Sequence, residues 1–542
     1  MASPAGASPR VSGDELRCQP YVDYIRSCYK NDLEAFSYYE ALVDYIEKGS
    51  RKYPGQTQHQ PRIFELRPIE SAIQYPALFP FTPLDWSSIS QRPQIVMLEG
   101  FPSPDAVVQL ARRWNLRPEL FIGHIFDKPS NPRGFYSDPT LPSRQGNVVR
   151  VHFRSLVKSL VQGPSLKLFM ENRSAVEEAC RTYEKRLFAE GQFGVTRFRG
   201  INQHDTCCCS IEQAVSFTVV PNKGSWVAIY LTDEGTSFLE GVRLPWTSYH
   251  NYATSLQGGT AVGTVPIVPY NKPVATESCD WNIGISENNC HERRNHTFPL
   301  APTFSQLHPS RNIVVNDEAD MELLSEDPFF LLASLFTTSA LSFMQLLNYL
   351  SVSINEDHSM EVDLLNIKLE RLRNCVRIVQ RVEAALAENL QWIAQGGCHT
   401  WPRARPGMSA AIKKQVVQSK LRTDHEALLQ KCIAMRQDCE SAMAFLVSYS
   451  QLLCGERGIA QAKEVARLTK LAAFFVPLAF VTSAFGMNIK ELGGSKTPSF
   501  YVFAVVAVIT LVATYVTMFW TTTWGWLGML STKAFQKLRR AK

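Results

Sequence analysis

The chain has 542 residues, of which 45% are hydrophobic and 20% are charged, and its formal net charge at pH 7 is +6. This length favours two to four folding units, and the small positive excess shows no basic cluster of the kind that nucleic-acid-binding proteins carry. The first 21 residues lack the apolar core of a signal peptide, so we expect no cleaved leader. Thirteen cysteines without repeated spacing indicate reduced thiols in the cytosol.

Residues 61–327 have the pattern of a cytosolic α/β domain, and residues 1–60 are read as an N-terminal extension. After the apolar run Val96–Gly100, Ser103 suits a helix N-cap and Pro104 the first turn, in agreement with a helix that ends at Trp114. Three more apolar segments bounded by turn residues predict strands at 148–153, 214–220 and 226–232. These elements predict a mixed sheet covered by helices.

Two kinds of segment in this domain are assigned no binding role. Cys207, Cys208 and Cys209 follow His204, but adjacent cysteines rarely converge on one tetrahedral zinc ion, and we expect no zinc there. Stretches rich in Pro, Gly, Ser and Asn are expected to be loops or insertions, at 50–60, 127–147 and 254–312.

Three apolar runs are long enough to be considered as membrane helices, which need roughly 20 residues. In the first, Pro328–Asn355, uncharged polar residues recur at every third position, and acidic residues precede the proline. This pattern favours a buried helix of a soluble domain over a membrane span. The second run, Leu471–Ile489, and the third, Ser499–Thr532, are separated by a short loop and predict a helical hairpin across the membrane.

Charge on either side of this hairpin predicts its orientation. Basic residues lead into the second run and follow the third, beyond Trp520, Trp524 and Trp526, whereas the loop between the runs carries only Lys490 and Lys496 against Glu491. The positive-inside rule therefore places both termini in the cytosol. We expect an integral, multi-pass protein of the lipid bilayer, in the plasma membrane first and an organelle membrane as the alternative.

Two long helices precede the membrane. Apolar residues at three-four spacing run from Leu365 to Ile393 and stop at Gly396, and a second series runs from Leu428 to Leu453. No proline interrupts the second helix before Pro477, so it can continue unbroken into the bilayer, over on the order of 100 Å. We interpret this as a stalk leading to a pore, with an antiparallel coiled-coil hairpin beside a lipid anchor as the alternative.

The start and end of the second run carry a recognisable pattern. The segment Arg467–Ala472, followed by Phe475–Phe480 and then by Phe485-Gly486-Met487-Asn488, resembles the first membrane helix of CorA magnesium channels, and especially of their fungal relatives. Here the Gly-Met-Asn signature ends the first of two C-terminal membrane helices.

The resemblance implies an α+β membrane protein with an N-terminal cytosolic mixed α/β domain, a long helical stalk and two C-terminal transmembrane helices, assembled as a homopentamer. The implied divisions of the C-terminal part are a helical and stalk region at 328–470, a first membrane helix at 471–489, an extracytosolic loop at 490–498, a second membrane helix at 499–522 and a basic cytosolic tail at 523–542.

The same resemblance implies a divalent-cation channel, with Mg²⁺ as the leading ion and Co²⁺, Ni²⁺ or Zn²⁺ open. Five Asn488 amides would offer oxygen atoms to a hydrated cation in a filter formed by Gly486, Met487 and Asn488, although a helix C-cap uses the same residue types. Pro477 would mark a helix kink. The implied pore-lining residues become apolar toward the inner end, where they would form a gate. On a generic helix the same residues would only pack against neighbours. They are Ser483, Ala479, Val476, Ala472, Leu468 and Val465.

Some features depart from the family or stay open. Many relatives carry an acidic loop after the signature, where this chain has lysines at 490 and 496, so a non-conducting sensor or scaffold is the second hypothesis. Asp317, Glu318 and Asp320 are candidates for regulatory cations, with a solvated acidic linker as the alternative. The chain has none of the common catalytic motifs, so we expect no enzyme activity and no organic cofactor.

Overall fold

The structure is a computed structural model, and it describes residues 13–30, 36–53, 61–66, 78–81, 92–126, 147–158, 182–183, 185–204, 208–222, 224–235, 263–264, 323–355, 365–404, 409–486, 501, 504–517 and 519–520. The chain divides into two compact units, Met1–Met443 and Ala444–Lys542.

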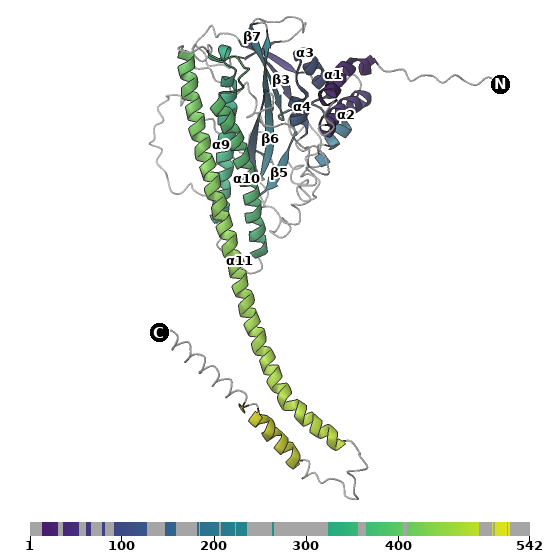
Figure 1. The fold of residues 1–542 in the computed structure, drawn as a ribbon, viewed down its shortest axis with the longest axis vertical. Coiled ribbons are helices and arrows are strands. Elements are labelled where there is room, and N and C mark those ends of the chain that lie inside the picture. The colour runs from purple at the N-terminus through teal and green to yellow at the C-terminus, as the bar shows by residue number, and fades with distance from the viewer. Residues whose placement is uncertain are drawn as a thin grey trace, which may run out of the picture. The chain divides into compact units, whose positions relative to one another are not determined.

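A mixed sheet forms the centre of the first unit (Figure 1). Its strand order is β2-β1-β3-β7-β6-β4-β8, and β5 pairs with β6. Only β3 and β7 run parallel among the described pairs. The strands are β1 (Arg62–Leu66), β2 (Leu78–Phe81), β3 (Gln94–Glu99), β4 (Val148–Lys158), β5 (Gly200–Gln203), β6 (Cys208–Asn222), β7 (Ser225–Thr232) and β8 (Gly263–Thr264). The strands predicted at 148–153, 214–220 and 226–232 are confirmed, the first two as parts of longer strands.

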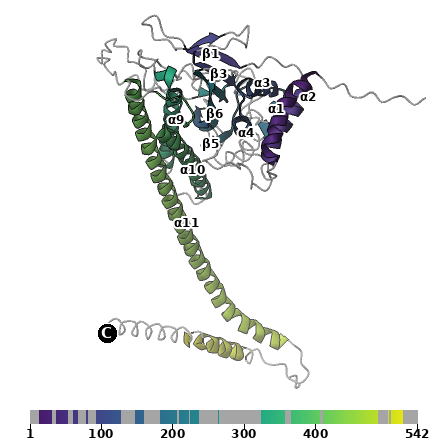
Figure 2. The ribbon, with the colours of Figure 1, turned by 45° about the horizontal axis from the view of Figure 1, so that its top comes forward.

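Side-chain alternation along the central strands divides the core into two layers. In β7, Val227, Ile229 and Leu231 enter one apolar cluster, while Trp226, Ala228 and Tyr230 enter the other. Successive residues of a strand point to opposite faces, so a strand with no polar face must be covered by helices on both sides. Figure 2 shows these two helical layers on either side of the sheet.

The first layer comes from the N-terminal half of the unit, with helices α1 (Gly13–Tyr29), α2 (Phe36–Lys52), α3 (Pro104–Trp114) and α4 (Pro118–Ile125). Residues 1–60, read from sequence as an extension, thus contribute two helices whose apolar side chains lie in this cluster. The predicted start of α3 is confirmed, because the Ser103 hydroxyl accepts a hydrogen bond from the Ala106 amide at 3.2 Å.

The second layer consists of α9 (Phe329–Asn355), α10 (Leu365–Gln395) and the first part of α11 (Ser409–Gly486). The first apolar run is α9, and two of its polar residues, Ser339 and Ser342, face the sheet. Ser339 Oγ donates to the His152 carbonyl at 2.6 Å, and Ser342 Oγ accepts from the Arg154 amide at 3.3 Å. The prediction of a buried helix is confirmed, since these hydroxyls satisfy backbone groups of β4 that water cannot reach.

The N-terminus of α9 is fixed by Asp327, a member of the acidic run in the sequence. Its carboxylate accepts from the Phe329 amide at 3.0 Å and forms an ion pair with Lys414 of α11 at 2.5 Å. The Asp327 side chain is 1% exposed, so it is a buried helix cap and not part of a solvated linker.

Helices α10 and α11 pack antiparallel with a repeat of seven residues. Asn389 of α10 contacts His425 of α11, and Glu383 forms an ion pair with Arg436 at 3.4 Å. The predicted end of α10 is confirmed at Gly396 and Gly397, whose φ angles of 65° and 90° stop the helix. Along the two helices, Cys375, Val382 and Asn389 of α10 and Cys439, Cys432 and His425 of α11 are all buried.

The second unit contains the C-terminal part of α11 and a shorter apolar helix at Ala504–Thr517. Pro477 lies inside α11 without ending it, so the expected unbroken helix is present and has 78 residues. Within the described part of this unit, the least exposed hydrophobic side chains are Val481 at 7% and Leu446 and Ala507 at 9% each.

Candidate functional site

Two described helices are long and apolar enough to cross a membrane, and burial separates them. The apolar window of Phe329–Val352 is 61% buried, whereas that of Ala411–Ala484 is 6% buried. The first is a core helix of the sheet domain, as its contacts with β4 show. The C-terminal part of α11 is therefore the better candidate for a membrane-spanning segment in the described chain.

The predicted pore positions form one exposed stripe on this part of α11. Leu468 and Val476 are each 65% exposed and Val465 is 59% exposed, and the smaller side chains at Ala472, Ala479 and Ser483 are exposed as well. With 3.6 residues per turn, the six positions fall within an arc of about 80°. Nothing else in the described chain covers this arc.

The less exposed positions of the same stretch lie on the other side of the helix. Ala473, Pro477 and Leu478 are half-buried and Val481 is buried. Their mean direction is about 160° from that of the stripe, by the same helical geometry. Aromatic and large apolar residues on the remaining faces, such as Phe475 and Phe480, are exposed at 57% and 74%. The stripe is therefore distinguished by its small and aliphatic side chains, not by exposure alone.

The expected filter lies at the end of α11. Gly486 is the last residue of the helix, and a Cβ placed on it would meet no atom within 4 Å in the single chain. Met487 and Asn488 lie outside the described residues, as do Asp317, Glu318 and Asp320. No group of three or more His, Cys, Asp or Glu side chains in the described part of the chain is arranged to hold a metal ion. Cys208 and Cys209 lie in β6.

Basic residues accompany the inner end of the stripe. Arg467 and Lys470 are exposed on α11, next to Leu468. They lie within one turn of Leu468 along the helix, on the side of α11 that is about 140–160° from the centre of the stripe.

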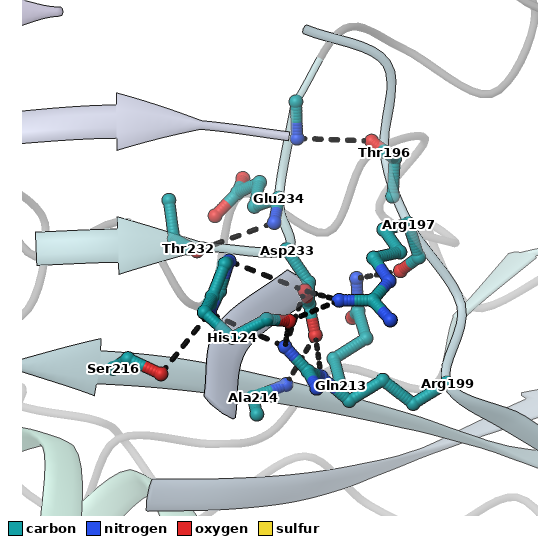
Figure 3. Close-up of polar contacts among 11 residues, drawn as sticks. His124, Thr196, Arg197, Arg199, Gln213, Ala214, Ser216, Thr232, Asp233 and Glu234 are labelled. Atoms are coloured by element: carbon teal, nitrogen blue, oxygen red, sulfur yellow. Dashed lines mark hydrogen bonds and ion pairs between the residues drawn. The ribbon is translucent and has the colours of Figure 1, made fainter. Parts of the chain in front are cut away.

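A buried ion-pair cluster that the sequence analysis did not identify lies where β7 ends (Figure 3). Asp233 accepts from Arg199 through both carboxylate oxygens, at 2.5 and 3.0 Å, and from the Ala214 amide at 2.6 Å. Arg197 donates to the His124 carbonyl at the end of α4. The side chains of these four charged or titratable groups, His124, Arg197, Arg199 and Asp233, are 0% exposed.

The protonation of His124 follows from its neighbours. Arg199 has no lone pair to offer, so His124 Nδ1, 3.2 Å from the guanidinium, acts as the acceptor. The proton then lies on Nε2, which is 3.6 Å from Asp233 Oδ1. Burial lowers the pKa of His124 well below its usual value, and the charges of Arg199, Arg197 and Arg150 lower it further. The cluster joins α4, β6 and β7 and has the features of a structural network.

The only sequence signal for this cluster was the alternation Arg197-Phe198-Arg199 and the acidic pair after β7. Neither signal is specific enough to predict the cluster, because its hydrogen-bonded partners lie 19 to 75 positions apart in the chain. Only the fold brings them together.

Comparison with known proteins supports a family for the C-terminal region. Residues 410–521 match the family described as "CorA-like Mg2+ transporter protein". The resemblance expected from the sequence is therefore confirmed over this range, which includes most of α11 and the helix at Ala504–Thr517. No curated protein matches the chain. Among solved structures, the "structure of the full-length CmaX protein" matches with 9% identity and a TM-score of 0.32, over 85% of this chain and 96% of that one.

Proposed function

We propose that this chain is a transmembrane channel for divalent metal cations, with Mg²⁺ as its principal ion, formed by a homopentamer in a lipid bilayer. The observation that carries the proposal is the coincidence of two features. The segment similar to CorA-like Mg²⁺ transporters contains the apolar part of α11, and that part presents a stripe of small and aliphatic residues that nothing else in the described chain covers.

A ring of symmetry-related α11 helices would give this stripe a role. Facing inward, it changes from Ser483 and Ala479 near the outer end to Leu468 and Val465 near the inner end. A ring of aliphatic side chains closes a pore by expelling water, and nearby positive charges raise the barrier to cations. In this proposal Leu468 and Val465 form the gate, and Arg467 and Lys470 oppose leakage through it.

The outer end of the pore is proposed to select the ion. Mg²⁺ dehydrates reluctantly and prefers six oxygen ligands, so a ring of Asn488 amides would hold its water shell without removing it. A side chain at position 486 would meet no atom within 4 Å in the single chain. The small size of Gly486 would therefore matter where the backbone of a neighbouring copy comes close in the assembled pore. Met487 completes the filter between these two residues.

Lys490 and Lys496 favour the second hypothesis, a membrane-anchored sensor or scaffold that does not conduct. Positive charges near the entrance lower the local concentration of cations. A channel and a scaffold would share the same fold, so only a measurement of flux separates them.

The test is divalent-ion flux into liposomes that contain the purified full-length protein, with Mg²⁺, Co²⁺, Ni²⁺ and Zn²⁺ compared side by side. Wild type should carry Mg²⁺, and Asn488→Ala should lose selectivity or flux, whereas Thr482→Ala, exposed on another face of α11, should behave as wild type. Absence of flux for all four ions would leave the scaffold hypothesis. Unchanged selectivity in Asn488→Ala would remove Asn488 from the filter.

The proposed topology places both termini on the cytosolic side of the plasma membrane or of an organelle membrane. Accessibility tags after Lys542 and beside Lys496 should label from opposite sides. Labelling from the same side would contradict the two-helix hairpin.

A further inference from the structure

The seam between α10 and α11 contains one position where two cysteines face each other. The contact of Asn389 with His425 gives the register of the two helices, and the ion pair of Glu383 with Arg436 agrees with their antiparallel direction. Moving along both helices by two repeats of seven residues from the first contact leads from Asn389 to Cys375 and from His425 to Cys439. Two heptads return to the same side of a packed helix, so the register places these two thiols opposite each other.

Direct contact between the side chains agrees with the register. The thiols of Cys375 and Cys439 interact with each other, and they are 5% and 0% exposed. Both are reduced in the structure. Thiols that interact across two packed helices reach bonding distance when the helices move toward each other at that position, which is the requirement for a disulfide.

We propose that Cys375 and Cys439 are a redox modification site, at which a peroxide converts the thiol pair into a disulfide that fastens α11 to α10. The bond would form four residues before Met443, where the first unit ends. It would therefore hold α11 to the sheet domain near the end of that unit. This inference concerns the first unit alone and does not depend on the proposed transport function.

The chemistry has two balanced steps. The sulfur of Cys439 attacks one oxygen of the peroxide, the O–O bond breaks, and Cys439 becomes a sulfenic acid while one water is released. The sulfur of Cys375 then attacks the sulfenic sulfur, the S–S bond forms, the S–O bond breaks, and a second water leaves with the Cys375 proton. Two thiols are oxidised by two electrons, and one hydrogen peroxide is reduced to two waters.

The surroundings assign different roles to the two cysteines. The interaction with Cys375 lowers the pKa of Cys439, against the opposing effects of burial and of the charges of Asp438 and Glu440, whereas the interaction with Cys439 and burial both raise the pKa of Cys375. Cys439 is therefore the better nucleophile toward peroxide, and Cys375 is the resolving thiol. Both lie beneath an exposed surface, since Arg373, Arg377 and Asp438 beside them are exposed, so a small peroxide has a short path to the pair.

Cys432 is a matched control on the same helix. It is 0% exposed and lies two turns from Cys439, but the register places Val382 opposite it, so it has no thiol partner there. Burial, followed by the charge of Glu383, raises the pKa of its thiol to about 12.

The experiment maps disulfides in the full-length protein after treatment with hydrogen peroxide, alkylation of the remaining thiols and digestion with trypsin. The three cysteines fall in separate peptides, Asn374–Arg377, Cys432–Arg436 and Gln437–Arg457. The last also contains Cys454, so the background is Cys454→Ser. We expect peptide Asn374–Arg377 linked to Gln437–Arg457 with the loss of two hydrogens, and its disappearance on addition of dithiothreitol.

Variants complete the test. Cys375→Ser should abolish the linked peptide and leave Cys439 as a sulfenic acid that dimedone labels, whereas Cys432→Ser should form the link as the background protein does. The inference is overturned if peroxide sufficient to oxidise the exposed Cys28 leaves both thiols alkylatable after unfolding, or if Cys439 is linked to Cys432 instead.

Discussion

Asn389 of α10 and His425 of α11 lie opposite each other, with the amide nitrogen of Asn389 3.5 Å from His425 Nε2. His425 Nδ1 is 2.8 Å from the Leu421 carbonyl, so the proton lies on Nδ1 and Nε2 accepts from Asn389. Asn389 also donates to Ser339 Oγ at 3.5 Å, and Ser339 donates to the His152 carbonyl. One chain of hydrogen bonds thus joins α11, α10, α9 and β4.

Removing the amide from this chain should destabilise the first unit. In Asn389→Ala, the buried His425 Nε2 loses its donor, and an unsatisfied buried polar group costs about 1–3 kcal/mol. Chemical unfolding should show a decrease of that size in the free energy of unfolding. Gln437→Ala changes an exposed amide on α11 and should alter it by less than about 0.5 kcal/mol. Equal effects of the two substitutions would contradict a structural role for Asn389.

Acidification should destabilise the same unit through its buried histidines. Burial is the main cause that lowers the pKa of both His124 and His425 in the folded protein. An unfolded histidine titrates near 6.5, so below about pH 6.5 the unfolded chain binds more protons and stability decreases as pH falls. Unfolding midpoints measured from pH 7.5 to pH 5 should decrease. His425→Gln should show a shallower decrease, and an identical slope would exclude His425 as a source.

Loss of the Asp233 carboxylate should decrease the free energy of unfolding far more than loss of a carboxylate on the surface. Asp233→Asn leaves Arg199 and Arg197 buried without their anion, and breaking a buried ion pair in this way costs about 3–5 kcal/mol. Asp44→Asn removes the exposed partner of Lys48, a pair one turn apart on α2, and such pairs contribute about 0.3–0.5 kcal/mol. Chemical unfolding of both variants tests the contrast, and a cost below about 1 kcal/mol for Asp233→Asn would contradict it.

Two exposed leucines of α11 lie on different faces of the helix, and comparing them tests which face lines the pore. Leu468 belongs to the proposed gate, whereas Leu471, 54% exposed, lies on a different side of the helix. A polar residue in an apolar constriction retains water, so Leu468→Ser should increase resting Mg²⁺ flux in liposomes several-fold. Leu471→Ser should leave the resting flux near that of wild type. Leakage of both variants to the same degree would show that this register of the pore line is wrong.

The end of α10 depends on a glycine. Gly397 has a φ of 90°, and a Cβ there would lie 2.7 Å from the Trp401 ring. Gly397→Ala should therefore destabilise the first unit by at least about 1 kcal/mol, through backbone strain and the clash. Gly458→Ala, which meets nothing within 4 Å inside α11, should instead stabilise its helix by up to about 1 kcal/mol. Thermal unfolding should show a lower midpoint for Gly397→Ala and an unchanged or higher midpoint for Gly458→Ala.

Local patterns in the sequence were sufficient for about half of the elements of the fold. Elements α1, α2, α4, β1, β2, β5 and β8 were not predicted, and α2 and β8 reach into stretches expected to be loops, at 50–60 and 254–312. The Ser103 cap, the glycine stop after α10 and the burial of α9 each depend on residues within a few turns of one another, and the structure agrees with all three. The N-terminal helices were missed because the burial of side chains such as Ile25 and Leu42 depends on contacts with distant segments. Local periodicity does not report such contacts.

By itself, the sequence determined the apolar segments, the long helices and the family resemblance at residues 467–488, because each is a property of neighbouring residues. Tertiary structure decided which apolar helix is buried, since the polar stripe of α9 acquires its meaning only when Ser339 reaches the His152 carbonyl. It also decided that Asp233 meets Arg199, and that Cys375 faces Cys439. Buried polar groups need partners wherever the chain can supply them, and those partners are distant in sequence.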